Sequence, residues 1–178
     1  MGATAAQGLI ATQVSTDAAV HAGTGTTTGK PSCLLNVNTT SQATTGTSEE
    51  VLATYTLPAN SLSATGKIIR VTAYFTTAAN ANTKIARIRL GGLTGAAVTA
   101  QSISTNNGVV MLCGYIIRTG ANTQAIVGHG IASSGAVTAL NSTSTQTDTG
   151  SLAIVITGAT ATSSGDLTFR VMIVEFMN

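Results

Sequence analysis

The chain has 178 residues, of which 8% are charged, and its formal net charge is +2 at pH 7. A typical soluble domain carries about 25% charged residues, so this surface has little charge to keep separate copies apart. Its basic residues are not gathered into a patch and no apolar run reaches the ~20 residues that span a bilayer, which argues against nucleic-acid binding and against a membrane-spanning chain.

Residues 1–48 predict an extended N-terminal arm. They are rich in Thr, Ala, Ser and Gly and hold too few large apolar side chains to form a core of their own. One short strand is expected within them, over Ser32–Val37. We expect this low-complexity arm to become ordered by lying across a neighbouring molecule, with a disordered tail as the alternative for residues 1–20. Residues 1–20 also lack the basic start and the continuous apolar segment of a signal peptide, so synthesis in a cytoplasm is expected.

Two sequence features of the arm partly match known binding or catalytic motifs, but neither predicts a site. Gly23–Lys30 ends in Gly-Lys, yet Thr24 stands where a phosphate-binding loop has its first glycine, and Pro31 follows the lysine. This favours a flexible loop. Asp17 and His21 lie four residues apart, but a low-complexity arm holds no fixed geometry between them.

The stretch from Glu50 to Gly92 predicts three strands. They cover Val51–Leu57, Lys67–Thr76 and Thr83–Gly92, and turn residues separate them at Pro58–Asn60, Ser63–Gly66 and Ala78–Asn82. In the middle strand one face, expected to be buried, holds Ile69, Val71, Ala73 and Phe75, and the other, partly solvated, holds Ile68, Arg70, Thr72 and Tyr74. Because tight turns join these strands, we predict an antiparallel β meander.

The second half of the chain predicts six further strands and shows no helical periodicity. The strands cover Ala96–Ile103, Val109–Arg118, Thr123–Ala132, Ala136–Leu140, Ser151–Thr157 and Leu167–Met177. The run Val109–Arg118 is almost continuously apolar, so we expect a central strand that is covered on both faces. Asn106–Gly108 is a turn signal, and Asn141–Gly150 and Gly158–Asp166 are expected to be loops.

These patterns predict an all-β fold. Eight or nine strands at regular spacing suit an antiparallel two-sheet sandwich over residues 49–178, preceded by the arm. A jelly roll of about eight strands is the preferred architecture, because the chain closes on one long strand. An immunoglobulin-like sandwich stays open, since strand order cannot be read from sequence.

Cys33 and Cys113 are expected to be buried thiols rather than a disulfide, because nothing in the sequence indicates secretion. No Cys-x-x-Cys pair is present, and neither histidine is close to a cysteine in the sequence. A zinc site is therefore not predicted.

The acidic residues do not predict a catalytic pair. Glu49 and Glu50 are adjacent, so in an extended strand their side chains point to opposite faces. Asp148 and Asp166 lie in separate predicted loops, where a solvated role is preferred. Calcium binding by these two aspartates is the alternative, although no Asp-x-Asp spacing supports it.

His129 stands between Gly128 and Gly130 within a predicted strand. The two glycines allow another backbone or a ligand to approach closely. A histidine beside a bulge or a subunit contact is preferred to a catalytic base, because no serine or aspartate partner occurs at motif spacing. The sequence thus predicts no catalytic, cofactor-binding or metal-binding residue, and no enzyme.

Five arginines fall inside predicted strands: Arg70, Arg87, Arg89, Arg118 and Arg170. In a sandwich they lie on outer faces or at strand ends, where Glu49, Glu50, Glu175 or a partner's surface can pair with them. Only three Tyr and three Phe are present, so a sugar-binding or nucleic-acid-binding groove lined by aromatic rings is weakly supported.

The segment Tyr55–Gly92 resembles virion structural proteins of tailed bacteriophages. It shares with them a Leu-Pro-Ala-Asn-Ser-Leu turn (Leu57–Leu62) before a strand and an Ala-Ala-Asn-Ala-Asn-Thr-Lys loop (Ala78–Lys84) before a strand that ends in glycine. Phe169–Phe176 looks like the closing strand of the same domain. The resemblance implies a jelly-roll-like β domain in a phage particle and carries no catalytic residue across.

Within such a particle, composition favours a capsid cement or decoration protein. A small, nearly neutral β domain with an arm fits a homotrimer that binds the major capsid protein on the outer head surface and stabilises the shell. We therefore expect it on the virion, after synthesis in the cytoplasm of the host bacterium. The alternatives are a tail-fibre or receptor-binding domain, then a carbohydrate-binding jelly-roll module, and last a hydrolase. No nucleic-acid or membrane partner is expected.

Overall fold

The computed structural model describes residues 33–104, 108–162 and 164–177, and every regular element in them is a β-strand. No helix in this part of the chain is long and apolar enough to cross a membrane. The strands are β1 (Cys33–Asn38), β2 (Gln42–Ala43), β3 (Glu50–Leu57), β4 (Ile68–Thr77), β5 (Lys84–Leu90), β6 (Ala96–Ile103), β7 (Val109–Gly120), β8 (Thr123–Ala132), β9 (Val137–Ser144), β10 (Leu152–Thr160) and β11 (Leu167–Phe176).

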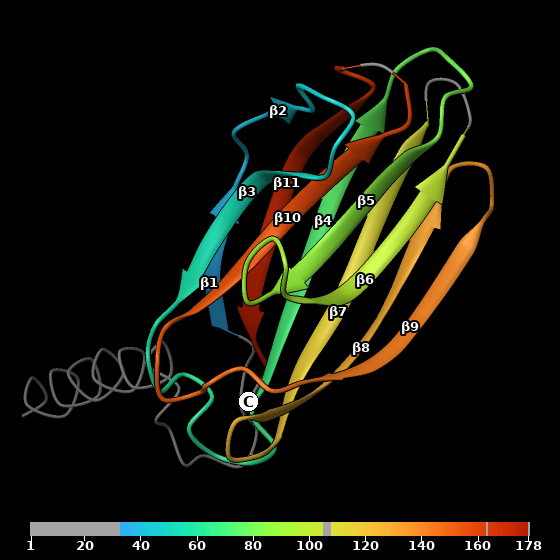
Figure 1. Ribbon diagram of the computed structural model, residues 1–178. Coiled ribbons are helices and arrows are strands. Elements are labelled where there is room, and N and C mark those ends of the chain that lie inside the picture. The colour runs from blue at the N-terminus through green and yellow to red at the C-terminus, as the bar shows by residue number, and fades with distance from the viewer. Residues whose placement is uncertain (1–32, 105–107, 163, 178) are drawn as a thin grey trace, which may run out of the picture.

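The strands form two antiparallel sheets that pack face to face (Figure 1). The larger sheet has the order β1-β11-β4-β7-β8-β9, with β2 pairing with β11 on the same side as β1. The smaller sheet has the order β3-β10-β5-β6. The predicted all-β, two-sheet sandwich is confirmed.

The strand order is that of a jelly roll. Four strands of the large sheet (β1-β11-β4-β7) and the four of the small sheet form its eight positions, and consecutive strands mostly change sheets, as β3 to β4, β4 to β5, β6 to β7 and β10 to β11 do. The hairpin β8–β9 is additional and widens the large sheet beyond β7.

The predicted meander over Glu50–Gly92 is wrong. Its three strands do not pair with one another: β3 pairs with β10, β4 with β7 and β11, and β5 with β6 and β10. Each strand has one apolar face that needs a facing sheet, and the alternation that identifies this face says nothing about which strand lies alongside.

The core lies between the sheets and contains the predicted face of β4. Ile69, Val71, Ala73 and Phe75 are fully buried, and the opposite side of the strand is partly exposed. The Phe75 ring meets that of Phe169 on β11 edge to face, with centroids 6.0 Å apart.

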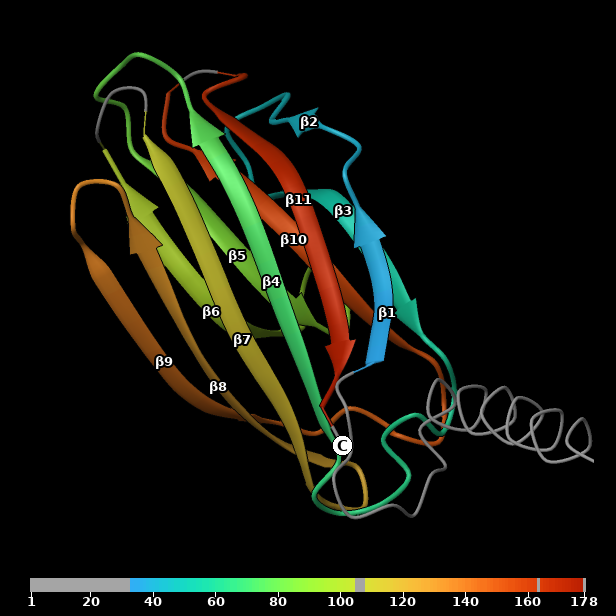
Figure 2. The same cartoon turned by 180° about the vertical axis from the view of Figure 1, so that it is seen from behind.

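The strand predicted over Val109–Arg118 is central, between β4 and β8, but it is covered on one face only. Val110, Leu112 and Ile116 point into the core, whereas Val109 on the other face is exposed. The apolar run predicts burial on both sides, but within the described chain nothing lies over the second side (Figure 2).

Two predicted loops begin later than expected. Strand β9 continues to Ser144, because Ser and Thr side chains suit an edge strand with one solvated face. Strand β10 continues to Thr160, where Gly158, Ala159 and Thr160 still pair with β5. The Asn106–Gly108 turn lies mostly outside the described residues.

Residues 33–48 add β1 and β2 to the edge of the large sheet, and β1 matches the short strand predicted over Ser32–Val37. Residues 1–32, with Asp17, His21 and Gly23–Lys30, lie outside the described residues. The boundary between arm and sandwich at residue 48 stays a prediction.

Candidate functional site

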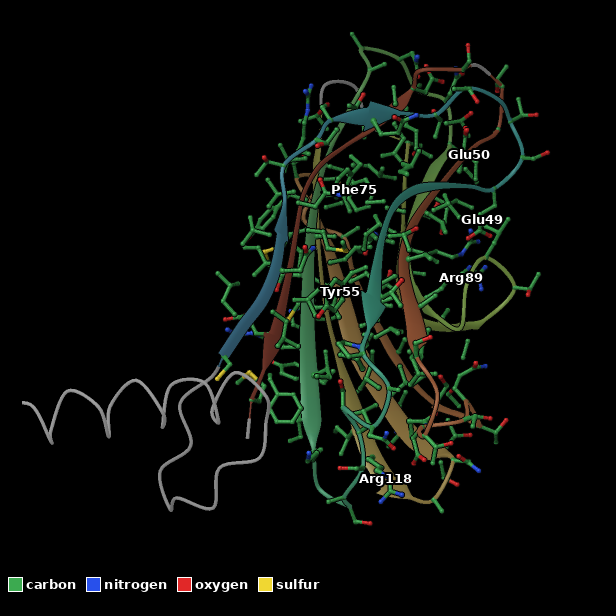
Figure 3. All side chains as sticks on the ribbon, turned by 90° about the vertical axis from the view of Figure 1, so that its left-hand side faces the viewer. Glu49, Glu50, Tyr55, Phe75, Arg89 and Arg118 are labelled. Atoms are coloured by element: carbon green, nitrogen blue, oxygen red, sulfur yellow. The ribbon has the colours of Figure 1, made fainter. Side chains whose placement is uncertain are left out.

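Glu49 lies on the outer face of the small sheet, between two arginines of β5 (Figure 3). Its carboxylate is 2.7 Å from Arg89 Nε and 3.0 Å from Arg87 Nη1, and it accepts a hydrogen bond from Thr157 Oγ1 at 2.5 Å. Burial alone would raise the pKa of Glu49, but the hydrogen bonds from Arg89 and Thr157 and the two positive charges outweigh it. They lower the pKa to about 2.

Glu50 points away from Glu49, as predicted for adjacent residues of an extended chain. Its carboxylate accepts hydrogen bonds from the backbone N–H of Thr45 at 2.5 Å and of Gly46 at 3.2 Å. Glu50 was one of several acidic residues that could pair with the strand arginines, but its donors are the backbone N–H groups of Thr45 and Gly46 and the hydroxyl of Thr45. The two carboxylates do not form an acid–base pair.

Asp148 is buried at one end of the sandwich, with 3% of its surface exposed. It accepts hydrogen bonds from Arg118 Nε at 2.5 Å and from the backbone N–H of Asn122 at 3.0 Å. The hydrogen bond from Arg118 is the main cause that lowers the pKa of Asp148. Asp148 thus anchors the β9–β10 connection to the β7–β8 turn, and the predicted solvated role is wrong.

Asp166 is equally buried, at the end where β4 and β5 are joined. Its two carboxylate oxygens accept hydrogen bonds from the side-chain amides of Asn80 and Asn82, at 2.7 and 2.8 Å. These bonds, Asn82 first, lower the pKa of Asp166, and the charge of the buried Lys84 adds to the effect.

The two aspartates cannot share a cation. Asp148 contacts Arg118, and the residue before Arg118 pairs with the first residue of β4. Asp166 precedes Leu167, which pairs with the last residue of β4. Ten residues of strand between them correspond to roughly 30 Å. In the described ranges no group of three or more His, Cys, Asp or Glu side chains gathers where a metal ion would bind.

The remaining strand arginines are also engaged. Arg70 Nη2 is 2.6 Å from Glu175 Oε2 on the neighbouring strand, which confirms the predicted pairing. Arg170 donates to the hydroxyls of Thr76 and Ser41, at 3.0 and 3.1 Å. Both groups lie on the large sheet, away from the core.

The glycines beside His129 serve the packing of one sheet on the other. A Cβ at Gly128 would lie 2.6 Å from the backbone oxygen of Val98, and one at Gly130 would lie 2.7 Å from Cβ of Gln101. The backbone that approaches is thus that of β6, and no ligand is needed to explain the glycines. His129 itself points to the opposite, partly exposed side.

Cys33 and Cys113 are separate thiols, as predicted. They lie on β1 and β7, which β11 and β4 separate, so about 14 Å of sheet divides them. Cys33 is buried, but Cys113 is partly exposed on the outer side of the large sheet, against the prediction that both are buried.

That outer side is the most unusual surface of the described chain. Seven of the nine exposed large apolar residues lie on it, and they are 36–65% exposed. We call this surface the large-sheet face. Its exposed apolar residues are Leu34, Val37, Tyr74, Val109, Val127, Ile131 and Val137. Partly exposed apolar residues, among them Met111, Tyr115, Ile117 and Ile173, fill the spaces between them.

Cross-strand pairing makes the large-sheet face continuous. One row runs Tyr74–Met111–Ile131–Val137 across four adjacent strands, from β4 to β9. The face contains one ion pair, Arg70 with Glu175, and no other part of the described chain lies over it (Figure 2). The outer face of the small sheet differs, because the charged cluster around Glu49 covers it.

The large-sheet face is suited to contact with another macromolecule rather than to chemistry on a small one. It is broad and largely apolar, and its arginines are held by side chains of the same face, Arg70 by Glu175 and Arg170 by Thr76 and Ser41. The sequence signal for it is the run of apolar residues on both sides of β7, which by itself does not distinguish a strand covered within one chain from one covered by a partner.

Comparisons with known proteins add little. No family model matches the sequence, and no curated protein is similar to it. One similar solved structure is that of Bacillus endospore appendages, described as a novel family of disulfide-linked pili. It has 9% identity and a TM-score of 0.34, over 86% of this chain and 97% of that one.

Structures of infectious bursal disease virus are also similar. The Gt strain structure has 17% identity and a TM-score of 0.33 over 83% of this chain, and the VP2 subviral particle has 16% and 0.32 over 83%. This chain spans about a third of the length of those virus proteins. With TM-scores this low, none of these likenesses supports a conclusion about function.

Proposed function

We propose that this chain is a non-enzymatic structural subunit of a bacteriophage particle, which decorates the outer surface of the head by binding the major capsid protein. In this proposal three copies form a homotrimer that is made in the host bacterial cytoplasm and stabilises the shell after it assembles.

The observation that carries the proposal is the large-sheet face on a jelly roll with few charges. Obligate assemblies bury surfaces that are more apolar than the rest of a protein, and their interfaces contain few charged residues. The described residues leave this face uncovered, and exposed apolar patches of this kind promote aggregation in water. The face is therefore best explained as one that is covered in a permanent assembly.

The polar clusters support a structural role. Glu49, Asp148 and Asp166 each bind donors of their own chain, and each fastens a connecting segment to a strand or to another connection. The turns that resemble those of phage virion proteins, Leu57–Leu62 and Ala78–Lys84, likewise join strands of the two sheets. Loops held in this way favour a rigid building block.

The test is binding of the purified protein to phage heads that lack it. We expect it to bind in a copy number close to that of the main shell protein, and to raise the temperature at which the heads release their DNA. A trace copy number in natural particles would favour a fibre or receptor-binding domain. Specific binding on a glycan array without binding to heads would favour the carbohydrate-binding module.

A further inference from the structure

We infer that the large-sheet face is the surface by which one copy of this chain packs against a second copy. The inference shares self-association with the proposed function but does not depend on the phage head. A face that meets its own copy closes a dimer, so the proposed homotrimer would need a second contact surface.

The size of the face fits such a contact. Six strands about 4.8 Å apart, with about nine residues each at about 3.4 Å, give roughly 900 Å². A stable protein–protein interface needs about 800 Å² per partner. Sheets also pack on sheets readily, at about 10 Å, through side chains like the Val, Ile, Met and Tyr of this face. The face is thus large enough to serve as an interface on its own.

The charges on the face favour a second copy over a charged partner. Arg70 and Glu175 neutralise each other at 2.6 Å, and Arg170 at one end is held by Thr76 and Ser41. A strongly acidic or basic partner would find no complementary patch. Two identical faces, in contrast, bring one uncompensated arginine each, Arg170, and this residue lies at one end of the face rather than among its apolar residues. Self-complementary contacts are also the commonest in oligomers.

The extent of the apolar surface also supports a second copy as the partner. The apolar surface extends to both edge strands, with Val137 on β9 exposed by 65% and Leu34 on β1 by 53%. A small ligand would need a cleft, whereas an apolar surface that reaches from edge to edge suits a partner as broad as the sheet itself.

Two lysine substitutions on the face test the inference. Val127→Lys and Ile131→Lys place a charge at positions that are 43% and 37% exposed on β8. The matched control is Val51→Lys, which is 39% exposed on β3 of the small sheet. In sedimentation velocity of the full-length protein, we expect each face variant to weaken self-association at least about tenfold, while the control associates like the wild type. Melting temperatures of the monomers verify folding.

Val127→Thr gives a milder test if lysine prevents folding, since threonine keeps the β-branched shape. Cys113 supplies a second readout, because this partly exposed thiol lies on the face and should react more slowly with a thiol reagent in the oligomer than in the Val127→Lys monomer. Cys33 is buried and serves as the unreactive reference.

A wild type that stays monomeric, or face variants that associate as tightly as the control, would overturn the inference. Face variants that stay oligomeric but no longer bind heads would assign the face to the capsid protein instead. Variants that become monomeric identify the self-association surface, whether or not the heads bind the wild type, so the two proposals fail separately.

Discussion

Glu49 shows how one residue organises the outer face of the small sheet. It precedes β3, yet it binds side chains of β5 and β10, so its carboxylate ties the segment before β3 to two strands. Arg89 is held on its other side by the carbonyl oxygen of Gly95, at 2.9 Å. Charge-assisted hydrogen bonds of this kind are stronger than neutral ones. The ionised carboxylate of Glu49 therefore stabilises the fold.

The pKa of Glu49 predicts an acid-dependent loss of stability. It is about 2 in the folded protein, below its ordinary value of 4.5. The stabilisation is therefore complete above about pH 4.5 and is lost as the pH falls towards 2. We expect Glu49→Gln to be less stable than the wild type at pH 7 by roughly 2–3 kcal/mol, and the difference to shrink towards pH 2. Urea unfolding of both proteins at several pH values measures it, and a difference that does not change with pH would contradict the prediction.

At the level of elements, the closest contact between the sheets is that of β6 with the strands β7 and β8. Gly114, Gly128 and Gly130 have no side chain on the inner side there, so Val98, Thr99 and Gln101 can come close to the large sheet. The same strands carry apolar residues outward. The glycines thus let β8 pack tightly on one side while its other side contributes to the large-sheet face.

This contact predicts that Gly128→Ala is destabilising. Its Cβ would lie 2.6 Å from the Val98 carbonyl oxygen and 2.8 Å from Cβ of Thr99, so the sheets would have to move apart. We expect a loss of roughly 1–3 kcal/mol in the free energy of unfolding, as for other overpacked cores. Gly120→Ala is the control, because its nearest neighbour, Cβ of Thr123, is 4.0 Å away. Equal stability of the two variants in thermal unfolding would show that the contact can relax.

At the level of the whole molecule, the proposed association depends on apolar area rather than on charge. Eight basic and six acidic residues make up the charge of all 178 residues, and the strand arginines are engaged within the chain. Long-range attraction and repulsion between copies are therefore weak.

Self-association should accordingly depend little on salt. We expect the dissociation constant to change less than about threefold between low and high NaCl, because screening acts on exposed charges and leaves apolar contacts in place. Sedimentation equilibrium at several salt concentrations measures this. A weakening of tenfold or more in high salt would indicate an association through ion pairs.

Much of the fold was predictable from the sequence. The alternation in Lys67–Thr76 identified the buried face of β4, and turn residues marked the ends of most strands. Adjacent Glu49 and Glu50 were expected to point apart, and they do. These features depend on neighbouring residues alone, since a strand has a period of two wherever it lies.

The pairing of strands was not predictable in the same way. Glu50–Gly92 looked like a meander because its turns are short, yet each of its strands pairs with partners far along the chain. The sequence predicts that Asp148 and Asp166 are solvated loop residues. Both are buried, and they accept hydrogen bonds from residues that lie far from them in the sequence. Contacts of this range depend on how the sheets close over one another, which local patterns do not contain.

By itself, the sequence determined where most of the strands lie, which side of the alternating strands is apolar, and that the chain has few charges. The tertiary structure alone decided which apolar sides meet. The inner sides of β4, β5, β7, β10 and β11 bury one another, while the outer side of the large sheet is left uncovered by the described chain. The physical reason is that a sandwich of two sheets has room inside for one face of each, so an apolar second face needs a partner from outside.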